Sequence, residues 1–415
     1  MQLPNLTGRC QSKTPMLHRG GIAITTTMFW LCVCCNLIAI ADSKKSKPDV
    51  FVNPLELTTP DPLLPLAQPL HPVELLTLVA ALDELNQQAQ AKLEAGDTVG
   101  DFEIWHRELR LRRAVSSLQE VEALGRVGAI AWSENQKTEV QLITGRLQTI
   151  QQAKSQPAAD LRLLQSLGTA FEQVRAPKSA LEVYEQILGA AQQRQDIAVQ
   201  EATLQTIAEL YLSWFDYPKA AIVYKKLLGL ATNVNTVGEV KYLQQLAYIY
   251  DKANQHRQAV AIKQQLAQVY LNEQQFTQIP AIRLAIASDY QSLGQLKEAF
   301  DNYQEAYASA WSMQQYYRAG DALRRLVALY RSQEQINEAL ETSQILLQAD
   351  QRASNIYGMI NTYDQIGQMY LKRNEHSKAL AAFQSGLELA NQLDFQQTYF
   401  AQQISQVTKL ISDRP

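Results

Sequence analysis

Cysteine is missing from most of this 415-residue chain. All four cysteines lie before residue 36, namely Cys10, Cys32, Cys34 and Cys35. The sequence that follows them therefore contains neither a disulfide framework nor a zinc site built from cysteine ligands. A stable fold in that part of the chain must come from packing alone.

Sequence motifs for catalysis are also missing. No nucleophile elbow, phosphate-binding glycine loop, zinc-ligand spacing or calcium loop occurs. His106 lies one helical turn from Glu103 and from Arg110, and it could hold a metal only with carboxylates from a second helix. We interpret His106 as a surface or cap histidine, and His256 and His376 in the same way. We expect neither an enzyme nor an evident cofactor.

Charge of one sign is not in excess. The chain has 38 Lys and Arg against 41 Asp and Glu, a net charge of −3, and no basic run or basic-aromatic stripe. Since nucleic-acid binding depends on clustered positive charge, we expect no nucleic-acid partner.

The first 41 residues have the pattern of a secretory signal peptide. A basic start, with Arg9, Lys13 and Arg19, precedes an apolar stretch that ends in Ala39-Ile40-Ala41. Cleavage there would begin the mature chain at Asp42 with 35 basic and 41 acidic residues, a net charge of −6. We expect export to the periplasm or thylakoid lumen. An uncleaved membrane anchor is the alternative.

Proline is concentrated in one stretch. Half of the 14 prolines lie between residues 48 and 72: Pro48, Pro54, Pro60, Pro62, Pro65, Pro69 and Pro72. Proline fixes an extended backbone and removes hydrogen-bond donors. Residues 42–72 are therefore a linker, or a strap whose leucines pack over the first helices.

Four positions recur at a step of 40 residues, with one step of 39. A small residue is followed three residues later by an aromatic ring, and a second helix carries an alanine and then a ring. The small residues are Gly168, Ala208, Ala247, Ala287, Val327 and Gly367, and the rings after them are Phe171, Tyr211, Tyr250, Tyr290, Tyr330 and Tyr370. The alanines are Ala180, Ala220, Ala259, Ala299, Ala339 and Ala379, and the residues after them are Tyr184, Tyr224, Lys263, Tyr303, Ser343 and Phe383. Such pairs indicate stacked helix hairpins.

These positions resemble the tetratricopeptide repeat (TPR) family over roughly residues 160 to 390. The resemblance implies an all-α, right-handed superhelical solenoid of helix hairpins. The family's usual period is 34 residues, so the extra six are expected to lengthen the helices where they join. Lys263 and Ser343 replace rings, and we expect looser packing in the third and fifth repeats. HEAT-type repeats are the alternative.

The chain is accordingly divided into six parts. They are a signal peptide (1–41), a Pro-rich linker (42–72), an N-terminal helical cap (73–120), a degenerate repeat (121–156), six TPR-like repeats (157–394) and a C-terminal capping helix (395–415).

The cap contains an arginine-rich helix. Arg107, Arg110, Arg112 and Arg113 lie beside several glutamates. A salt-bridged face that locks the cap is the favoured interpretation. The other is a contact with an anion or an acidic peptide.

In the TPR family the first helices line a groove that holds a partner peptide. Carried over by position, the groove residues are Arg162, Gln165, Glu172, Gln205, Glu209, Lys241, Gln244, Tyr248, Asp251, Ser288, Gln291, Asp321, Arg324, Arg331, Asp364 and Gln368. We expect these side chains to be exposed, so that removal of Tyr248 or Arg324 leaves the fold nearly unchanged. A merely solvated inner face is the alternative.

The glutamine-rich stack, the signal and the dense helix before it look like exported TPR assembly factors of cyanobacterial photosystem II. That resemblance implies docking of a precursor membrane-protein subunit and delivery of weakly bound manganese. An envelope scaffold for polysaccharide or pilus export is the alternative of a different class.

Overall fold

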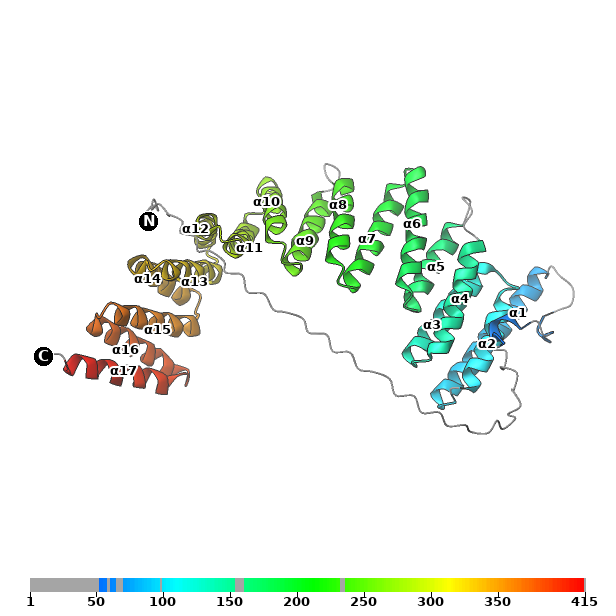
Figure 1. Ribbon diagram of the computed structural model, residues 1–415, viewed down its shortest axis with the longest axis horizontal. Coiled ribbons are helices and arrows are strands. Elements are labelled where there is room, and N and C mark those ends of the chain that lie inside the picture. Colours follow the sequence, from blue (N-terminus) through cyan, green and yellow to red (C-terminus); the bar gives the residue numbers. More distant parts are fainter. Residues whose placement is uncertain are drawn as a thin grey trace, which may run out of the picture. The chain divides into compact units, whose positions relative to one another are not determined.

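The computed structural model describes residues 52–57, 60–64, 70–97, 99–153, 160–231 and 236–413. Those residues form α-helices and two short 3-10 helices, without a strand (Figure 1). The predicted signal peptide and its cleavage site lie outside the described residues. The described part belongs to one compact unit, Val52–Pro415.

The helices follow one another along the chain with short links. They are η1 (Pro54–Glu56), α1 (Pro72–Glu94), α2 (Gly100–Arg112), α3 (Ser117–Ser133), α4 (Lys137–Ala153), α5 (Leu161–Gln173), α6 (Pro177–Gln193), α7 (Ile197–Ser213), α8 (Tyr217–Ala231), α9 (Thr236–Lys252), α10 (His256–Asn272), η2 (Phe276–Gln278), α11 (Ile279–Ser292), α12 (Leu296–Ser312), α13 (Tyr316–Ser332), α14 (Ile336–Arg352), α15 (Ile356–Lys372), α16 (His376–Gln392) and α17 (Gln397–Ser412).

In the two hairpins from α13 to α16 the paired helices are of equal length. Each of these four helices has 17 residues, and three residues separate one from the next. The odd-numbered helices from α3 to α15 are the first helices of the hairpins, and the even-numbered ones are the second. The predicted all-α solenoid of TPR hairpins is confirmed, and the additional residues of each repeat lengthen both helices.

A small residue of each first helix accommodates the ring of its second helix. A Cβ atom added to Gly168 would lie 2.7 Å from Cζ of Tyr184, and one added to Gly367 would lie 2.5 Å from Cε1 of Phe383. The alanines of the second helices, such as Ala180, are fully buried. The periodic positions in the sequence are therefore the contact between the paired helices.

The fifth repeat does not show the looser packing expected from Ser343. Val327, which takes the place of the small residue, is 1% exposed, and Ser343, which takes the place of the ring, is fully buried. The larger side chain now lies on the first helix and the smaller one on the second, so Val327 takes up part of the space that the missing ring leaves. Ser343 Oγ donates a hydrogen bond to Ala339 O at 2.7 Å.

The third repeat replaces its ring by a buried ion pair. Lys263 is 4% exposed, and its Nζ lies 2.6 Å from Asp251 Oδ1 and 2.7 Å from Asp289 Oδ2. Asp289 is also buried, and its other oxygen lies 2.9 Å from His256 Nδ1. The aliphatic stem of a lysine can fill part of the space of a ring. The prediction of a loosely packed third repeat therefore missed charged groups that join α9, α10 and α11.

The first boundary of the repeats lies earlier than predicted. α3 begins at Ser117, so the predicted start of the degenerate repeat at residue 121 falls inside a helix. Ser116 caps this helix, because its side chain accepts a hydrogen bond from Gln119 N at 3.1 Å. The final helix begins at Gln397, two residues after the predicted start of the C-terminal cap.

The links share one backbone conformation that the sequence did not reveal. A residue of each described link from α3 onward has positive φ, and these residues recur about every 20 positions: Asn135, Arg175, Gln195, Phe215, Asn254, Gln274, Gly294, Gln314, Glu334, Ser354, Asn374 and Asp394. In the link after α13, Glu334 N donates to Arg331 O at 3.2 Å and Gln335 N donates to Tyr330 O at 3.0 Å. This pair of bonds is a Schellman motif, which ends the helix.

Candidate protein-binding face of the first helices

The groove residues predicted from the sequence all lie on first helices, from α5 to α15. Exposed side chains are those of Arg162, Gln165, Glu209, Lys241, Gln244, Tyr248, Asp251, Ser288, Gln291 and Arg331. The half-buried ones are Glu172, Gln205, Asp321, Arg324, Asp364 and Gln368. None of them is fully buried, so the structure places the whole set at or near a surface.

Cavities lie between successive first helices. One of about 570 Å³ between α11 and α13 includes Ser288, Asp321 and Arg324 in its lining. Another, of about 370 Å³, lies between α3 and α5 and includes Arg162 and Gln165.

Two smaller cavities continue the series. One of about 310 Å³ lies between α13 and α15 and includes Arg331 and Gln368. The other, of about 260 Å³, is lined by Glu172, Glu209 and Trp214 beside the ends of α5 and α7. The first-helix face is therefore hollowed at several points, with predicted groove residues in each wall.

Several groove residues also hold the two helices of a hairpin together. Tyr184 donates its hydroxyl proton to Glu172 at 2.5 Å, and Tyr303 donates to Gln291 at 2.9 Å. Burial, together with the Glu172 carboxylate, raises the pKa of Tyr184 well above its usual value. The second-helix ring thus reaches between the helices and ends on a polar group of the groove.

Other groove residues hydrogen-bond to a neighbouring helix. Gln205 Nε2 lies 2.7 Å from Tyr242 Oη, and Gln244 Nε2 lies 2.9 Å from Tyr270 Oη. Burial and the Glu201 carboxylate raise the pKa of Tyr242 to about 12. The sequence interpretation assumed that no packing need explains these polar side chains, and for such residues that assumption is wrong.

Arg324 is the clearest correction. Its guanidinium lies 2.8 Å from Asp321 Oδ1 and 2.8 Å from Oδ1 of Asp350, which is fully buried. Burial lowers the pKa of Arg324, but the two carboxylates outweigh this and raise it above the usual value. Removing Arg324 would leave Asp350 buried without its cation, so the expectation of an unchanged fold is wrong for this residue.

A smaller set of groove residues remains available to a partner. Within the described residues, the side chains of Arg162, Gln165, Glu209 and Arg331 make no hydrogen bond or ion pair. Tyr248 is 49% exposed, and the Lys252 ammonium lies 5.5 Å from the centroid of its ring. No structural need accounts for these positions.

The arginine-rich helix α2 is engaged within the chain. Arg112 pairs with Glu108 at 3.0 Å and with Asp83 of α1 at 2.6 Å. Arg107, Arg110 and Arg113 contact the segment before α1. These contacts support a salt-bridged face that locks the cap.

Metal-ligating groups do not gather in the described part of the chain. No group of three or more His, Cys, Asp or Glu side chains there is placed to hold an ion. His106 Nε2 lies 2.6 Å from Glu139 Oε2 of α4, and this pair has no third ligand of those types in the described residues. No helix among the described residues has the length and apolar character needed to span a bilayer.

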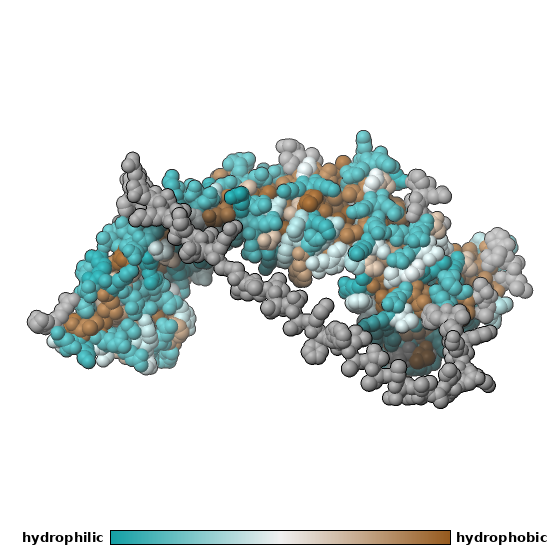
Figure 2. Space-filling view, in the orientation of Figure 1, coloured by the Kyte–Doolittle hydropathy of each residue, from teal (hydrophilic) through white to brown (hydrophobic). Residues whose placement is uncertain are grey.

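The visible surface is mostly hydrophilic, and hydrophobic residues gather in small separate patches (Figure 2). The exposed side chains of Trp214 and Phe215, 39% and 74% exposed, belong to the link between α7 and α8. Apart from Gly294, the other links carry polar residues at the position of Phe215. The sequence analysis did not single out this pair.

Comparison with known proteins finds similarity in solved structures only. No family model matches the chain, and no curated protein matches it. The BtubC structure from P. vanneervenii is 16% identical, with a TM-score of 0.36 over 53% of this chain and 92% of that one. MamA is 21% identical, with a TM-score of 0.34 over 45% of this chain and 96% of that one.

A third similar structure is the Rap protein complexed with Competence and Sporulation Factor. It is 13% identical, with a TM-score of 0.31 over 80% of this chain and 99% of that one. Because all three similarities are low, the assignment to a TPR solenoid rests on the hairpins and their repeated contacts.

Proposed function

We propose that this protein is a non-enzymatic scaffold that binds a segment of another protein along its first helices. The observation that carries the proposal is the series of cavities between successive first helices, whose walls contain polar side chains without a structural partner. Repeated hairpins present such side chains at regular intervals, which suits an extended ligand.

The chemistry of the face favours a ligand of mixed character. Tyr248 offers an exposed ring, Arg162 and Arg331 offer guanidinium groups, and Glu209 offers a carboxylate. Aromatic and arginine side chains contribute most of the energy in many interfaces. A partner segment that carries acidic groups and an apolar side chain would complement them.

A photo-crosslinking residue at position 248 of the full chain would capture this partner in the source organism. The affinity of the identified partner is then measured for the double variant Tyr248→Ala, Arg331→Ala. We expect a loss of about 1–3 kcal/mol with little change in melting temperature, because neither side chain supports another helix.

The matched control carries Ile222→Ala and Lys226→Ala, which remove an exposed apolar and an exposed basic side chain from the second helix α8. Parental affinity in the control and reduced affinity in the groove variant would support the proposal. Equal affinity of the groove variant and the parent would reject the first-helix face as the binding surface.

We further propose that the scaffold acts after export, as an assembly factor for a membrane-protein complex. The signal-like sequence before Asp42 supports export, and the resemblance to photosystem II assembly factors supplies the precursor subunit as partner. The envelope scaffold for polysaccharide or pilus export remains the alternative. Copurification of photosystem subunits or of envelope machinery distinguishes the two, and N-terminal sequencing tests the start at Asp42.

Manganese, if it is delivered, would be held weakly by scattered carboxylates. The net charge of −6 expected for the mature chain supports this, since hard divalent ions need several oxygen ligands. Calorimetric titration of the mature protein with Mn²⁺ is therefore expected to show weak, non-stoichiometric heats. A stoichiometric nanomolar site would contradict the expectation.

A further inference from the structure

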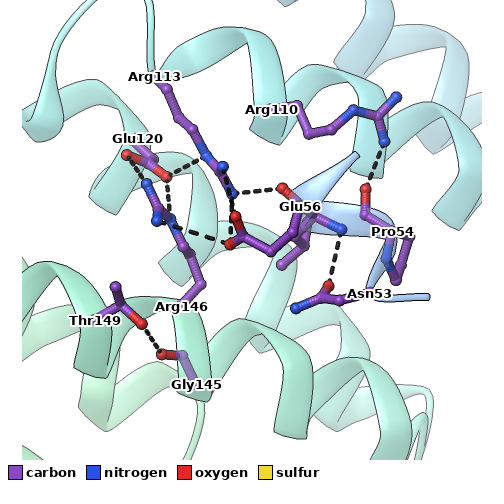
Figure 3. Close-up of polar contacts among 10 residues, drawn as sticks. Asn53, Pro54, Glu56, Arg110, Arg113, Glu120, Gly145, Arg146 and Thr149 are labelled. Carbon is purple, nitrogen blue, oxygen red and sulfur yellow. Dashed lines mark hydrogen bonds and ion pairs between the residues drawn. The ribbon is translucent and has the colours of Figure 1, made fainter. Parts of the chain in front are cut away.

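Residues 52–57 and 60–64, here called the strap, lie against helix α2 (Figure 3). Leu55 is fully buried in the same cluster as Phe102, Trp105 and Leu109. The strap sequence carries Glu56 and Asp61 and no basic residue. It is therefore an acidic segment with a 3-10 turn at residues 54–56, whose fully buried anchor is Leu55 and whose Leu63 and Leu64 pack partly buried at the edge of another cluster.

Three arginines at successive turns of α2 hold the strap. Arg107 forms a bidentate pair with Asp61: its Nε donates to Oδ2 at 2.8 Å and its Nη2 donates to Oδ1 at 2.9 Å. Arg110 donates to Pro54 O at 2.7 Å, and Arg113 donates to Leu55 O at 2.6 Å and lies 3.3 Å from the Glu56 carboxylate. Residues spaced three apart share one face of a helix, so the arginines form a single row.

One arginine of the row, Arg113, is oriented from behind by a buried carboxylate. Glu120 of α3, whose side chain is 5% exposed, accepts from Arg113 Nε at 2.9 Å and from Arg146 Nε of α4 at 2.7 Å. Figure 3 shows Arg113 and Arg146 both directed toward Glu56. Because Glu120 pairs with Arg113 and Arg146 independently of the strap, these two guanidinium groups keep their geometry when the strap leaves.

The strap itself is held only by side chains. Its backbone hydrogen bonds, Glu56 N to Asn53 O and Leu64 N to Asp61 O, are internal. Within the described residues, no backbone-to-backbone hydrogen bond joins it to a helix. One buried leucine, arginine contacts to backbone carbonyls and arginine–carboxylate pairs are the contacts that a helical domain makes with a short linear motif.

We propose that α2, α3 and α4 form a recognition site for an acidic peptide with a leucine anchor, which the strap fills as an intramolecular ligand. A partner protein with a segment of the same chemistry displaces the strap and binds Arg107, Arg110 and Arg113. This site is separate from the first-helix face and does not depend on it. The site agrees with both interpretations of the arginine-rich helix. The arginines form salt bridges within the cap while the strap is bound, and they bind an acidic peptide of the partner when the strap is displaced.

Direct binding of a strap peptide tests the site. A fluorescent peptide of residues 50–64 is titrated into the full chain and into a variant with Leu55→Ser and Asp61→Asn, with anisotropy as the readout. The tethered strap competes at a high effective concentration, roughly millimolar, so the parent binds weakly. We expect the variant to bind at least about ten times more tightly, because its own strap has lost the anchor and one ion pair.

Matched substitutions test whether that binding is specific to the proposed site. Adding Arg113→Ala to the released variant should abolish binding while Arg146 still pairs with Glu120, and adding Arg194→Ala, an exposed arginine at the end of α6, should have no effect. A peptide with Leu55→Ser should fail to bind. A chain with Glu56→Gln and Asp61→Asn keeps the leucine and should bind with intermediate affinity, which covers the case in which Leu55→Ser disturbs α2.

Two outcomes overturn the proposal. Absence of peptide binding to both released chains would show that the strap is only a structural part of the cap. A concentration-dependent dimer of the parent, formed by exchange of straps, would assign the site to a second copy of the chain instead of a partner.

Discussion

Lys263 shows how one residue can depart from a repeat pattern and keep its position in the core. The corresponding residue is a ring in four of the six repeats, and Asp289 occupies a position that is apolar in the other repeats. The two departures lie 2.7 Å apart as an ion pair. Each charge is therefore tolerated because the other is present, which the sequence of either helix alone does not reveal.

Lys263→Ala is expected to lower the free energy of unfolding by about 3–5 kcal/mol, because it leaves Asp289 buried without its cation. The double variant Lys263→Tyr, Asp289→Leu restores the residue types of the other repeats and should be at least as stable as the parent. Chemical denaturation followed by circular dichroism measures both. A double variant as unstable as Lys263→Ala would contradict this account of the pair.

Asp61 gives the strap a defined dependence on pH. The hydrogen bonds from Arg107 lower the pKa of Asp61 below its usual value, against the opposing effect of burial. A carboxyl whose pKa is lower in the folded state adds stability above its unfolded pKa, and this is lost as pH falls through the folded value. The strap is therefore held by this pair at neutral pH and released from it in acid.

The matched pair of parent and Asp61→Asn isolates that contribution. The difference between their melting temperatures should be constant above about pH 5 and should shrink as pH falls through the folded pKa of Asp61. Other carboxyl groups titrate in both proteins and cancel. Equal melting temperatures of the two proteins at neutral pH would show that the Asp61–Arg107 pair adds no stability.

At the scale of the helix, the recurring link fixes where each helix ends. Residues with φ near +55° end the helices, and the bonds of the Schellman motif satisfy carbonyl groups of the last turn. A side chain in this left-handed conformation costs about 1–2 kcal/mol relative to the right-handed one, and glycine avoids that cost. Most of the links nevertheless carry a residue with a side chain.

Glu334→Gly should therefore raise the free energy of unfolding by about 1 kcal/mol, after the entropy that glycine adds to the unfolded chain is subtracted. Gly294→Ala, at the equivalent position in the preceding hairpin, should lower it by a similar amount. Both are measured by denaturant titration. If Glu334→Ala raised the free energy of unfolding as much as Glu334→Gly, the left-handed backbone conformation would not be the cause of the gain.

The sequence was sufficient for the elements and their pairing because Gly168, Tyr184 and their counterparts recur at fixed spacing. It was not sufficient for the groove. Arg324 and Asp350 are 26 residues apart and on different helices, and no periodicity signals that a charge at one position satisfies a buried charge at the other. The pairing of Glu120 with Arg146 was missed for the same reason, since Arg146 lies on the following helix.

At the scale of the whole molecule, contacts are local in sequence. The substantial contacts between described helices join neighbours along the chain or next neighbours, as between α3 and α5. The buried apolar residues also form separate clusters, with one reaching Ile286 and the next beginning at Ala287. Stability in such a stack is approximately the sum of the hairpins and the interfaces between them.

A destabilising change should accordingly act over a limited distance. In Lys263→Ala, amide hydrogen exchange is expected to accelerate in α9 to α12, which contain the lost ion pair and its neighbours, while α1, α2 and α15 to α17 keep their parental rates. Mass spectrometry of proteolytic fragments after exchange resolves these segments. Val327→Ala provides the matched comparison, because it opens a cavity in the fifth repeat and should accelerate exchange around α13 and α14 instead. Uniform acceleration of amide exchange along the chain in either variant would show that the solenoid unfolds as one cooperative unit. That result would contradict the local coupling between neighbouring hairpins, on which independent binding positions along the first-helix face depend.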